Sequence, residues 1–223
     1  MERPLVHLRP HEPVAERVLV PGDPGRALRL AQALCETPAK MFNHNRGLWG
    51  YTGTALDGAP LTVQSTGIGG PSAAAVIEEL AVLGARRIVR VGTCDALGDE
   101  LALGDVIAVE AALADDGTSR ALGHSGAVRP DPALLAALRP GARAATVASR
   151  DLFYDAAATV PRPGGALASD LTSAAVLAVA AHLGLAAASV VAVTRAGVAV
   201  IDADALDAAE HAMGRLAAQA LGA

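Results

Sequence analysis

The sequence predicts an α/β fold, a single domain in which a mixed, largely parallel, twisted sheet is flanked by helices. Short β-branched stretches recur along the chain, and Ala- and Leu-rich stretches with helical spacing lie between them. This alternation is typical of a largely parallel sheet covered by helices. The 223 residues are 52% hydrophobic but only 2% aromatic, which favours one core packed from aliphatic side chains. We therefore expect one domain over residues 1–223.

The expected strands are short apolar runs rich in Val, Ile and Thr. They cover residues 17–20, 61–66, 87–93, 105–113, 142–149 and 188–197. Helices are expected over 25–35, 71–84, 131–139, 169–184 and 203–221. The second helix begins with Pro71 and ends at Gly84, and the fourth begins with Ser169 or Asp170 as a cap and ends at Gly184. Residues 114–130 and 155–166 are rich in Gly, Pro, Asp and Ala and are expected to be loops.

Charge and cysteine content exclude several classes of protein. The formal net charge is −5 and no long basic run occurs, which argues against nucleic acid or an anionic membrane as a partner. The first residues, "MERPLVHLRPHEP", have no apolar core of signal-peptide length, and every apolar stretch is interrupted by Gly, His or Arg before it reaches the length of a membrane span. Cys35 and Cys94 form neither a disulfide framework nor a zinc spacing, and the spacing of His7, His11 and His44 is not that of a helical metal pair. We therefore expect a cytoplasmic protein without a metal.

Two glycine-rich turns each follow an expected strand and open an expected helix. They read "VPGDPGR" at 20–26 and "STGIGGPS" at 65–72. Glycine lets the backbone approach a ligand that side chains would exclude. The second turn is not a dinucleotide fingerprint, because the third glycine of G-x-G-x-x-G is missing. Each turn either binds a ligand or simply redirects the chain.

An arginine, Arg90, interrupts the apolar strand "RIVRVGT". Burial of a guanidinium is costly unless a negative group pairs with it. Either the strand lies at an edge with Arg90 outside, or its carboxyl end forms an anion site, where open α/β sheets usually bind ligands. Together with Gly22, Arg26, Arg46 and Thr93, Arg90 completes a set of three guanidiniums, backbone donors and a hydroxyl. That set suits phosphate, which guanidiniums bind with two parallel hydrogen bonds.

Five motifs in chain order carry a resemblance to a known family. They are "VPGDPGR", "NRGLWGYTGT", "STGIGGPSAAAVIEEL", "RIVRVGTCDALGDELALGDVI" and "SRDLFY". The chain resembles the nucleoside phosphorylase-I family, in the branch of uridine phosphorylase and hexameric purine nucleoside phosphorylase. That family cleaves the N-glycosidic bond of a nucleoside with inorganic phosphate and releases a free base and a pentose 1-phosphate. The resemblance implies phosphate as co-substrate, no further cofactor, and homodimers that share active sites within a hexamer, a trimer of dimers.

The resemblance also implies a role for individual residues. Phosphate would be bound by Gly22, Arg26, Arg46, Arg90 and Thr93, with Arg46 supplied by the neighbouring subunit. The sugar would be bound by His7 of the neighbour and by Ile68, Leu171 and Thr172. The base would be bound by Cys94, Asp95, Phe153 and Arg195. Arg90, Arg195 and Asp170 would take part in catalysis. A small buried thiol, rather than a nucleophile, is the expected nature of Cys94.

The sugar motif departs from the family pattern. Asp170, Leu171 and Thr172 stand where the family has Glu-Met-Glu, and a threonine hydroxyl cannot replace a bidentate carboxylate. The loss of a charged acceptor would cost about 1.5 to 3 kcal/mol of sugar binding. Asp170 either replaces that acceptor or caps the following helix. A nucleoside phosphorylase with an altered sugar or base preference is therefore expected, and a catalytically impaired homologue that binds phosphate or a nucleoside as a sensor or partner subunit is the alternative.

The base-binding half departs from the family as well. Asp95 stands where the family usually has glycine, and Arg195 stands in place of the purine enzyme's catalytic aspartate. If Asp95 points inward, it favours a base with N–H donors, such as a purine; if it points outward, it carries no such meaning. The segment after "LFYD" lacks the Gln-x-Arg pair that recognises uracil. Arg162 is either its substitute or a solvated loop arginine.

Overall fold

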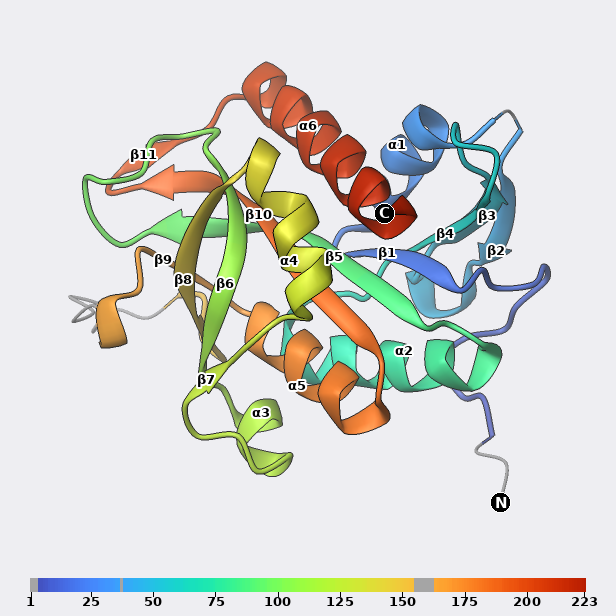
Figure 1. Ribbon diagram of the computed structural model, residues 1–223, viewed down its shortest axis with the longest axis horizontal. Coiled ribbons are helices and arrows are strands. Elements are labelled where there is room, and N and C mark those ends of the chain that lie inside the picture. Colours follow the sequence, from blue (N-terminus) through green and yellow to red (C-terminus); the bar gives the residue numbers. More distant parts are fainter. Residues whose placement is uncertain (1–3, 37, 155–162) are drawn as a thin grey trace.

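A central sheet with helices on both faces forms the molecule (Figure 1). The computed structural model describes residues 4–36, 38–154 and 163–223. Helices α2, α3 and α5 lie on one face, and α1, α4 and α6 lie on the other (Figure 1). Their bounds are α1 Pro24–Leu34, α2 Gly69–Leu83, α3 Gly117–Ala121, α4 Pro132–Leu138, α5 Ser173–Leu183 and α6 Ala203–Gly222. The α/β class predicted from the sequence is confirmed.

The described residues form a mixed sheet in which parallel pairs lie at the centre. The strands are β1 Arg17–Pro21, β2 Lys40–Asn43, β3 Gly50–Thr54, β4 Pro60–Gln64, β5 Arg87–Ala96, β6 Val106–Asp115, β7 Ala127–Val128, β8 Arg143–Arg150, β9 Ala168–Asp170, β10 Ala186–Ala196 and β11 Ala199–Val200. Strand β5 pairs in parallel with β1 and β10 and antiparallel with β9. Strands β5, β10, β6, β8 and β9 pair in a closed circle, and β1, β4, β3 and β2 extend the sheet from β5. Strand β5 is therefore an interior strand, and the edge-strand alternative for Arg90 is wrong.

Both faces of β5 are buried, which explains its nearly continuous apolar sequence. Ile88 packs into the core beneath α2 and α5, while Val89 and Val91 pack into the core beneath α1 and α6. Small and branched aliphatic side chains fill both cores, as the composition predicted. None of the described helices is long and apolar enough to cross a membrane.

The six expected strands and five expected helices are present, with shifted ends. The expected start of the fourth helix is wrong, because residues 168–170 form β9 and the helix begins at Ser173. The expected loop 114–130 contains α3 and β7. Strands β2, β3 and β11 are also additional; each is short and forms by antiparallel pairing with a neighbour. Of the expected loop 155–166, residues 155–162 lie outside the described residues, as does the proposed substitute Arg162.

Candidate active site

A cavity of about 620 Å³ lies beside the carboxyl ends of β1 and β5. It brings together residues from both glycine-rich turns and from β5, β8 and β9. The lining residues are Gly22, Asp23, Pro24, Arg26, Gly67, Ile68, Gly69, Arg90, Gly92, Thr93, Cys94, Asp95, Arg150, Leu152, Phe153, Tyr154, Ser169, Asp170, Leu171, Thr172 and Thr194. Most of the site residues predicted from the sequence therefore surround one cavity.

The guanidinium of Arg90 is buried in this cavity, and one of its nitrogen atoms has no hydrogen-bond partner among the described residues. Arg90 is 7% exposed, and its Nη2 lies 3.2 Å from Oδ2 of Asp170. Its Nη1 has no hydrogen-bond partner among the described residues. Burial lowers the pKa of Arg90 and the Asp170 carboxylate opposes that shift, and an arginine stays charged at neutral pH. A buried, charged and unpaired N–H group is costly unless an anion accepts from it.

Asp170 is held by several donors at the start of α5. Its Oδ1 accepts from Oγ of Ser149 at 2.6 Å and from the backbone N–H of Thr172 at 3.1 Å. Its Oδ2 accepts from Oγ of Ser173 at 2.6 Å and also pairs with Arg90. The backbone N–H of Ser173 donates to the same carboxylate. Asp170 thus caps the first turn of α5, and both of its oxygens are already engaged.

Arg26 enters the same cavity from the first turn of α1. The Asp23 side chain caps this helix by accepting from the Arg26 backbone N–H at 2.6 Å. The Nε of Arg26 donates to Oε1 of Glu210 at 2.8 Å, and Arg29 donates to Oε2 of the same carboxylate. Glu210 lies on α6 and is 2% exposed. Glu210 was not among the predicted site residues; the available signal was its position on the face of α6 that also buries Ala209 and Met213.

Asp95 and Phe153 line one wall of the cavity, and Arg195 contacts both of them. Nε and Nη2 of Arg195 donate to Oδ1 and Oδ2 of Asp95 at 2.9 Å and 2.5 Å. The guanidinium carbon of Arg195 lies 4.2 Å from the centre of the Phe153 ring, in a cation–π arrangement. Asp95 therefore lines the cavity, and both of its oxygens accept from Arg195. A preference for a base with N–H donors stays a prediction, and the pairing with Arg195 compensates the charge on which it depends.

Arg150 also lines the cavity, and sequence analysis gave it no role. It is the last residue of β8, and its Nη2 donates to Oγ of Ser169 on β9 at 2.5 Å. The available signal was its position directly after the expected strand 142–149, because the carboxyl ends of strands often carry binding residues.

Cys94 is a buried thiol in the wall of the cavity. Its Sγ approaches the backbone carbonyl of Ala192 at 3.6 Å. Burial raises the pKa of Cys94, and the Asp170 carboxylate adds to the shift. Because the thiolate is the reactive form, Cys94 is not set up as a nucleophile.

Three predicted residues are not part of the lining of this cavity: Arg195, which contacts the lining residues Asp95 and Phe153, and the surface residues Arg46 and His7. Arg46 is exposed and has a left-handed backbone conformation with φ of 59°. His7 lies near it, since Nδ2 of Asn45 donates to the His7 carbonyl at 2.9 Å. The backbone N–H groups of Val6, His7 and Leu8 donate to the carboxylate of Glu79 on α2. His7 and Arg46 thus form one surface region, apart from the cavity that Arg26 and Arg90 share.

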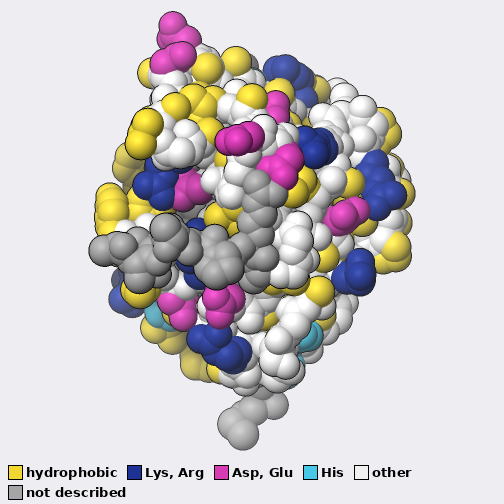
Figure 2. All heavy atoms as spheres, turned by 90° about the vertical axis from the view of Figure 1, so that its left-hand side faces the viewer, with side chains coloured by type: hydrophobic (Ala, Val, Ile, Leu, Met, Phe, Trp, Pro, Cys, Tyr) yellow, Lys and Arg dark blue, Asp and Glu magenta, His cyan; other side chains and the backbone are white. Residues whose placement is uncertain are grey.

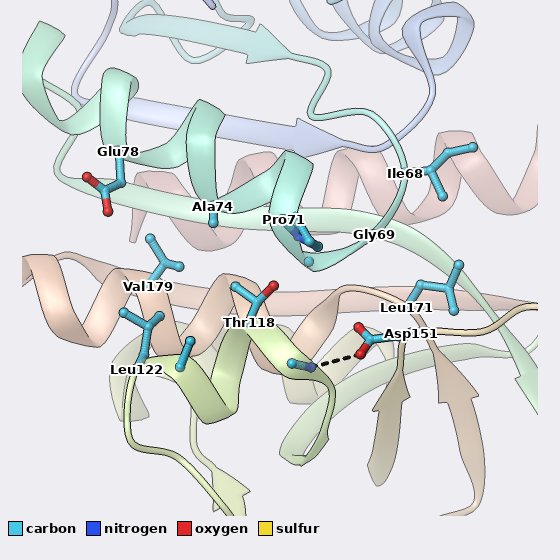
Figure 3. A pocket seen from close by; sticks show the side chains of 13 residues that line it. Ile68, Gly69, Pro71, Ala74, Glu78, Thr118, Leu122, Asp151, Leu171 and Val179 are labelled. Carbon is cyan, nitrogen blue, oxygen red and sulfur yellow. Dashed lines mark hydrogen bonds between the residues drawn. The ribbon is translucent and has the colours of Figure 1, made fainter. Parts of the chain in front are cut away.

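A second hollow of about 670 Å³ adjoins the cavity between α2, α3 and α5 (Figure 3). Ile68, Gly69 and Leu171 belong to the lining of both. The remaining wall is largely apolar, with Pro71 and Val179 facing it from α2 and α5. At its edge the Asp151 carboxylate accepts from the backbone N–H of Gly117 at 2.9 Å. The face of the molecule shown in Figure 2 carries acidic and basic side chains interspersed, without a patch of one sign.

The chain matches the model of a known protein family over most of its length. The family model described as "Phosphorylase superfamily" matches residues 16–223. The chain therefore belongs to the phosphorylase superfamily. Within the described residues, no group of three or more His, Cys, Asp or Glu side chains is placed to hold a metal ion.

Individual relatives are nucleoside phosphorylases. The chain is 39% identical over 108 residues to a DeoD-type purine nucleoside phosphorylase of Oceanobacillus iheyensis, 40% identical over 107 residues to a guanosine phosphorylase of Halorubrum lacusprofundi, and 42% identical over 106 residues to a uridine phosphorylase of Escherichia coli. These matches cover 48%, 48% and 47% of this chain but only 45%, 43% and 40% of the relatives. The chain thus matches less than half the length of these curated relatives.

The fold is similar over a longer stretch. A uridine phosphorylase structure from Vibrio fischeri superimposes with a TM-score of 0.85 and 27% identity, covering 94% of this chain and 92% of that one. The fold similarity therefore extends beyond the segment of high sequence identity.

Proposed function

We propose that this protein is a nucleoside phosphorylase that cleaves the N-glycosidic bond of a nucleoside with inorganic phosphate, yielding a free base and a pentose 1-phosphate. The observation that carries the proposal is the buried Arg90, whose Nη1 lacks a partner among the described residues and which shares a cavity with Arg26. The uridine, guanosine and purine nucleoside phosphorylases among the relatives support this choice of reaction.

Phosphate would bind between Arg26, Arg90 and Thr93, close to the backbone of Gly22. Each of the two guanidiniums is fixed by a buried carboxylate, Arg26 by Glu210 and Arg90 by Asp170. Donors held in place before the ligand arrives need little reorganisation, so they stabilise charge efficiently. A tetrahedral anion with several acceptor oxygens suits donors that converge from strand β5, helix α1 and the turn between β1 and α1.

The reaction needs such an anion beneath the sugar. A phosphate oxygen attacks C1′ as the C1′–N bond breaks, and the electron pair of that bond leaves with the base. The sugar gains oxocarbenium character in the transition state, as in glycoside hydrolysis. The negative charge of the bound phosphate stabilises this developing positive charge, and the arginines hold the phosphate in position.

The sugar would lie against Ile68, Leu171 and Thr172. Asp170 is an unsuitable replacement for the missing glutamate, because its oxygens are engaged by Arg90, Ser149 and the start of α5. Its proposed part in catalysis is to position Arg90. Thr172 is the residue left to contact the sugar hydroxyls, and its side chain makes no capping hydrogen bond. We therefore expect tolerance of sugars that lack a hydroxyl.

A second subunit would complete the site. His7 and Arg46 lie together on the surface, outside the cavity of their own chain. We propose that they reach the cavity of a neighbour in a homodimer, and that dimers assemble into a hexamer. We also propose a cytoplasmic location, which suits the two unpaired cysteines.

The test is phosphate-dependent release of free base from a panel of ribonucleosides and 2′-deoxyribonucleosides. Arg90→Ala should reduce kcat/KM by about 10²- to 10³-fold, the usual effect of removing a preorganised donor. Arg139→Gln serves as a matched control, because Arg139 is an exposed arginine paired with Glu110. No turnover of any nucleoside by folded wild-type protein would contradict the proposal. Binding of phosphate or nucleoside without turnover would favour the non-catalytic alternative.

A further inference from the structure

Arg150 differs from the other two arginines that line the cavity. Arg90 pairs with Asp170, and Arg26 pairs with Glu210. Arg150 has no carboxylate within ion-pair distance in the parts of the chain that the structure describes, and its one hydrogen bond there goes to the neutral hydroxyl of Ser169. A guanidinium has five N–H donors and no acceptor. Within the described residues, Arg150 therefore brings to the cavity a positive charge that no carboxylate pairs with and N–H donors beyond the one that Ser169 accepts.

The position of Arg150 assigns it to one wall. Its partner Ser169 lies opposite Asp95 in the register of β9 and β5. Asp95 in turn binds Arg195, which stacks on Phe153. Arg26, by contrast, approaches from α1, beyond β1 on the other side of β5. Arg150 thus lies on the wall that carries the aromatic ring, while Arg26 lies on the opposite side of β5.

Among the described residues of this wall, Arg150 is the charged side chain without an ionic partner. The negative charge of Asp95 is already compensated by Arg195, whose Nε and Nη2 donate to it. The Ser169 hydroxyl already accepts from Arg150. A ligand with a carbonyl oxygen can accept from Arg150, whereas an amino group in the same place would put donor against donor.

We propose that Arg150 is a specificity-determining residue that selects oxo-bases, such as uracil and hypoxanthine, over adenine. The inference rests on the proposed function and names its substrate class. When the C1′–N bond breaks, its electron pair stays on the base nitrogen while a phosphate oxygen bonds to C1′. In an oxo-base this charge spreads to the carbonyl oxygen, where the Arg150 guanidinium stabilises it until the base takes a proton from water. The charge would be stabilised more strongly as the bond breaks, so the effect extends to kcat.

The kinetic test compares uridine and inosine with adenosine. Arg150→Gln should lower kcat/KM for the two oxo-base nucleosides by about ten- to a hundredfold, the usual range for a hydrogen bond to a charged group. Activity on adenosine should stay the same or rise, and the KM for phosphate should change by less than about twofold. Arg150→Lys keeps the charge without the planar fork and should fall in between. Arg139→Gln, at an exposed ion pair, is the control and should behave as wild type. An equal loss on all three nucleosides, or no loss, would overturn the inference.

A binding measurement separates this inference from the proposed function. Calorimetry of folded wild-type protein with free uracil, hypoxanthine and adenine needs no turnover. Tighter binding of the oxo-bases, lost in Arg150→Gln, would support the assignment even if no nucleoside were cleaved. Equal affinity for adenine, or no binding of any free base, would overturn it while leaving phosphorolysis to be judged by its own assay.

Discussion

The buried guanidinium of Arg90 has room in the fold because residue 92 has no side chain. A Cβ on Gly92 would collide with Nη1 and Cζ of Arg90. The φ of Gly92 lies outside the left-handed region, so alanine could adopt its backbone conformation. Gly92 is therefore required by close approach of a side chain and not by backbone strain.

The space left by the missing side chain of Gly92 is needed for the Arg90 guanidinium to reach the cavity. Gly92→Ala should displace the Arg90 guanidinium and raise the KM for phosphate about tenfold or more, because one strong, charge-assisted contact is lost. The measurement is steady-state kinetics with phosphate varied, and phosphate calorimetry gives an independent value.

A double-mutant comparison identifies the cause. In an Arg90→Ala background the collision is absent, so Gly92→Ala should then add little further loss. If the two substitutions reduced phosphate binding independently, the collision would not be the mechanism.

At the scale of elements, one side chain of α2 ties the N-terminal segment to the fold. The Glu79 carboxylate accepts from the backbone N–H groups of Val6, His7 and Leu8, at distances from 2.6 to 3.0 Å. Burial by itself would raise the pKa of Glu79, but these backbone donors outweigh it and leave the pKa below its usual value of 4.5. The charged form of Glu79 therefore stabilises the docked segment.

The lowered pKa predicts how this attachment depends on pH. A carboxylate with a lowered pKa in the folded state stabilises it fully above its unfolded pKa, and that contribution is lost as the pH falls through the lowered value. The segment should thus stay docked at pH 7 and loosen progressively below about pH 4.5. Hydrogen exchange at residues 6–8, measured against pH, tests this.

A substitution provides the control for the same element. Glu79→Gln should make the exchange of residues 6–8 fast at pH 7 and remove its dependence on acid, since the charge is absent. Glu110→Gln changes an exposed glutamate on another element and should leave the exchange of these residues as in wild type. Unchanged protection in Glu79→Gln would contradict the assignment.

At the scale of the whole molecule, the proposed active site spans two chains. His7 and Arg46 lie outside the cavity that contains Arg26 and Arg90. In a symmetric dimer, each subunit contributes the same residues to the site of the other subunit. Arg46→Ala should therefore damage both sites of a dimer, as should Arg90→Ala.

Mixing these two variants tests the shared site directly. Dissociation and reassociation of Arg46→Ala with Arg90→Ala should restore about a quarter of wild-type activity, since half of the dimers are mixed and one of their two sites is intact. Mixing Arg26→Ala with Arg90→Ala should restore none, because both residues belong to the same chain's cavity. Failure of the first mixture to regain activity would place Arg46 outside the neighbour's site.

Sequence reasoning found elements whose cause is local. The apolar runs predicted β1, β5 and β10, because strands buried on both faces have nearly continuous apolar sequences. The three residues of β9 carried no comparable signal, since this strand exists by pairing with β5 and β8. The start of α5 was predicted too early for the same reason. Ser169 and Asp170 are residue types that suit a helix cap, but in the fold residues 168–170 pair with neighbouring strands as β9.

The α/β class, the two glycine-rich turns and the unusual position of Arg90 could be predicted from local sequence, because a charge within an apolar strand is costly wherever that strand lies. Which carboxylates pair with the arginines depends on the packing of distant elements. Glu210 follows Arg26 by 184 residues, and Asp95 and Arg195 are 100 residues apart. Whether a carboxylate is free to bind a ligand or already paired depends on distances of a few ångströms between elements remote in the chain, and no local pattern encodes those distances.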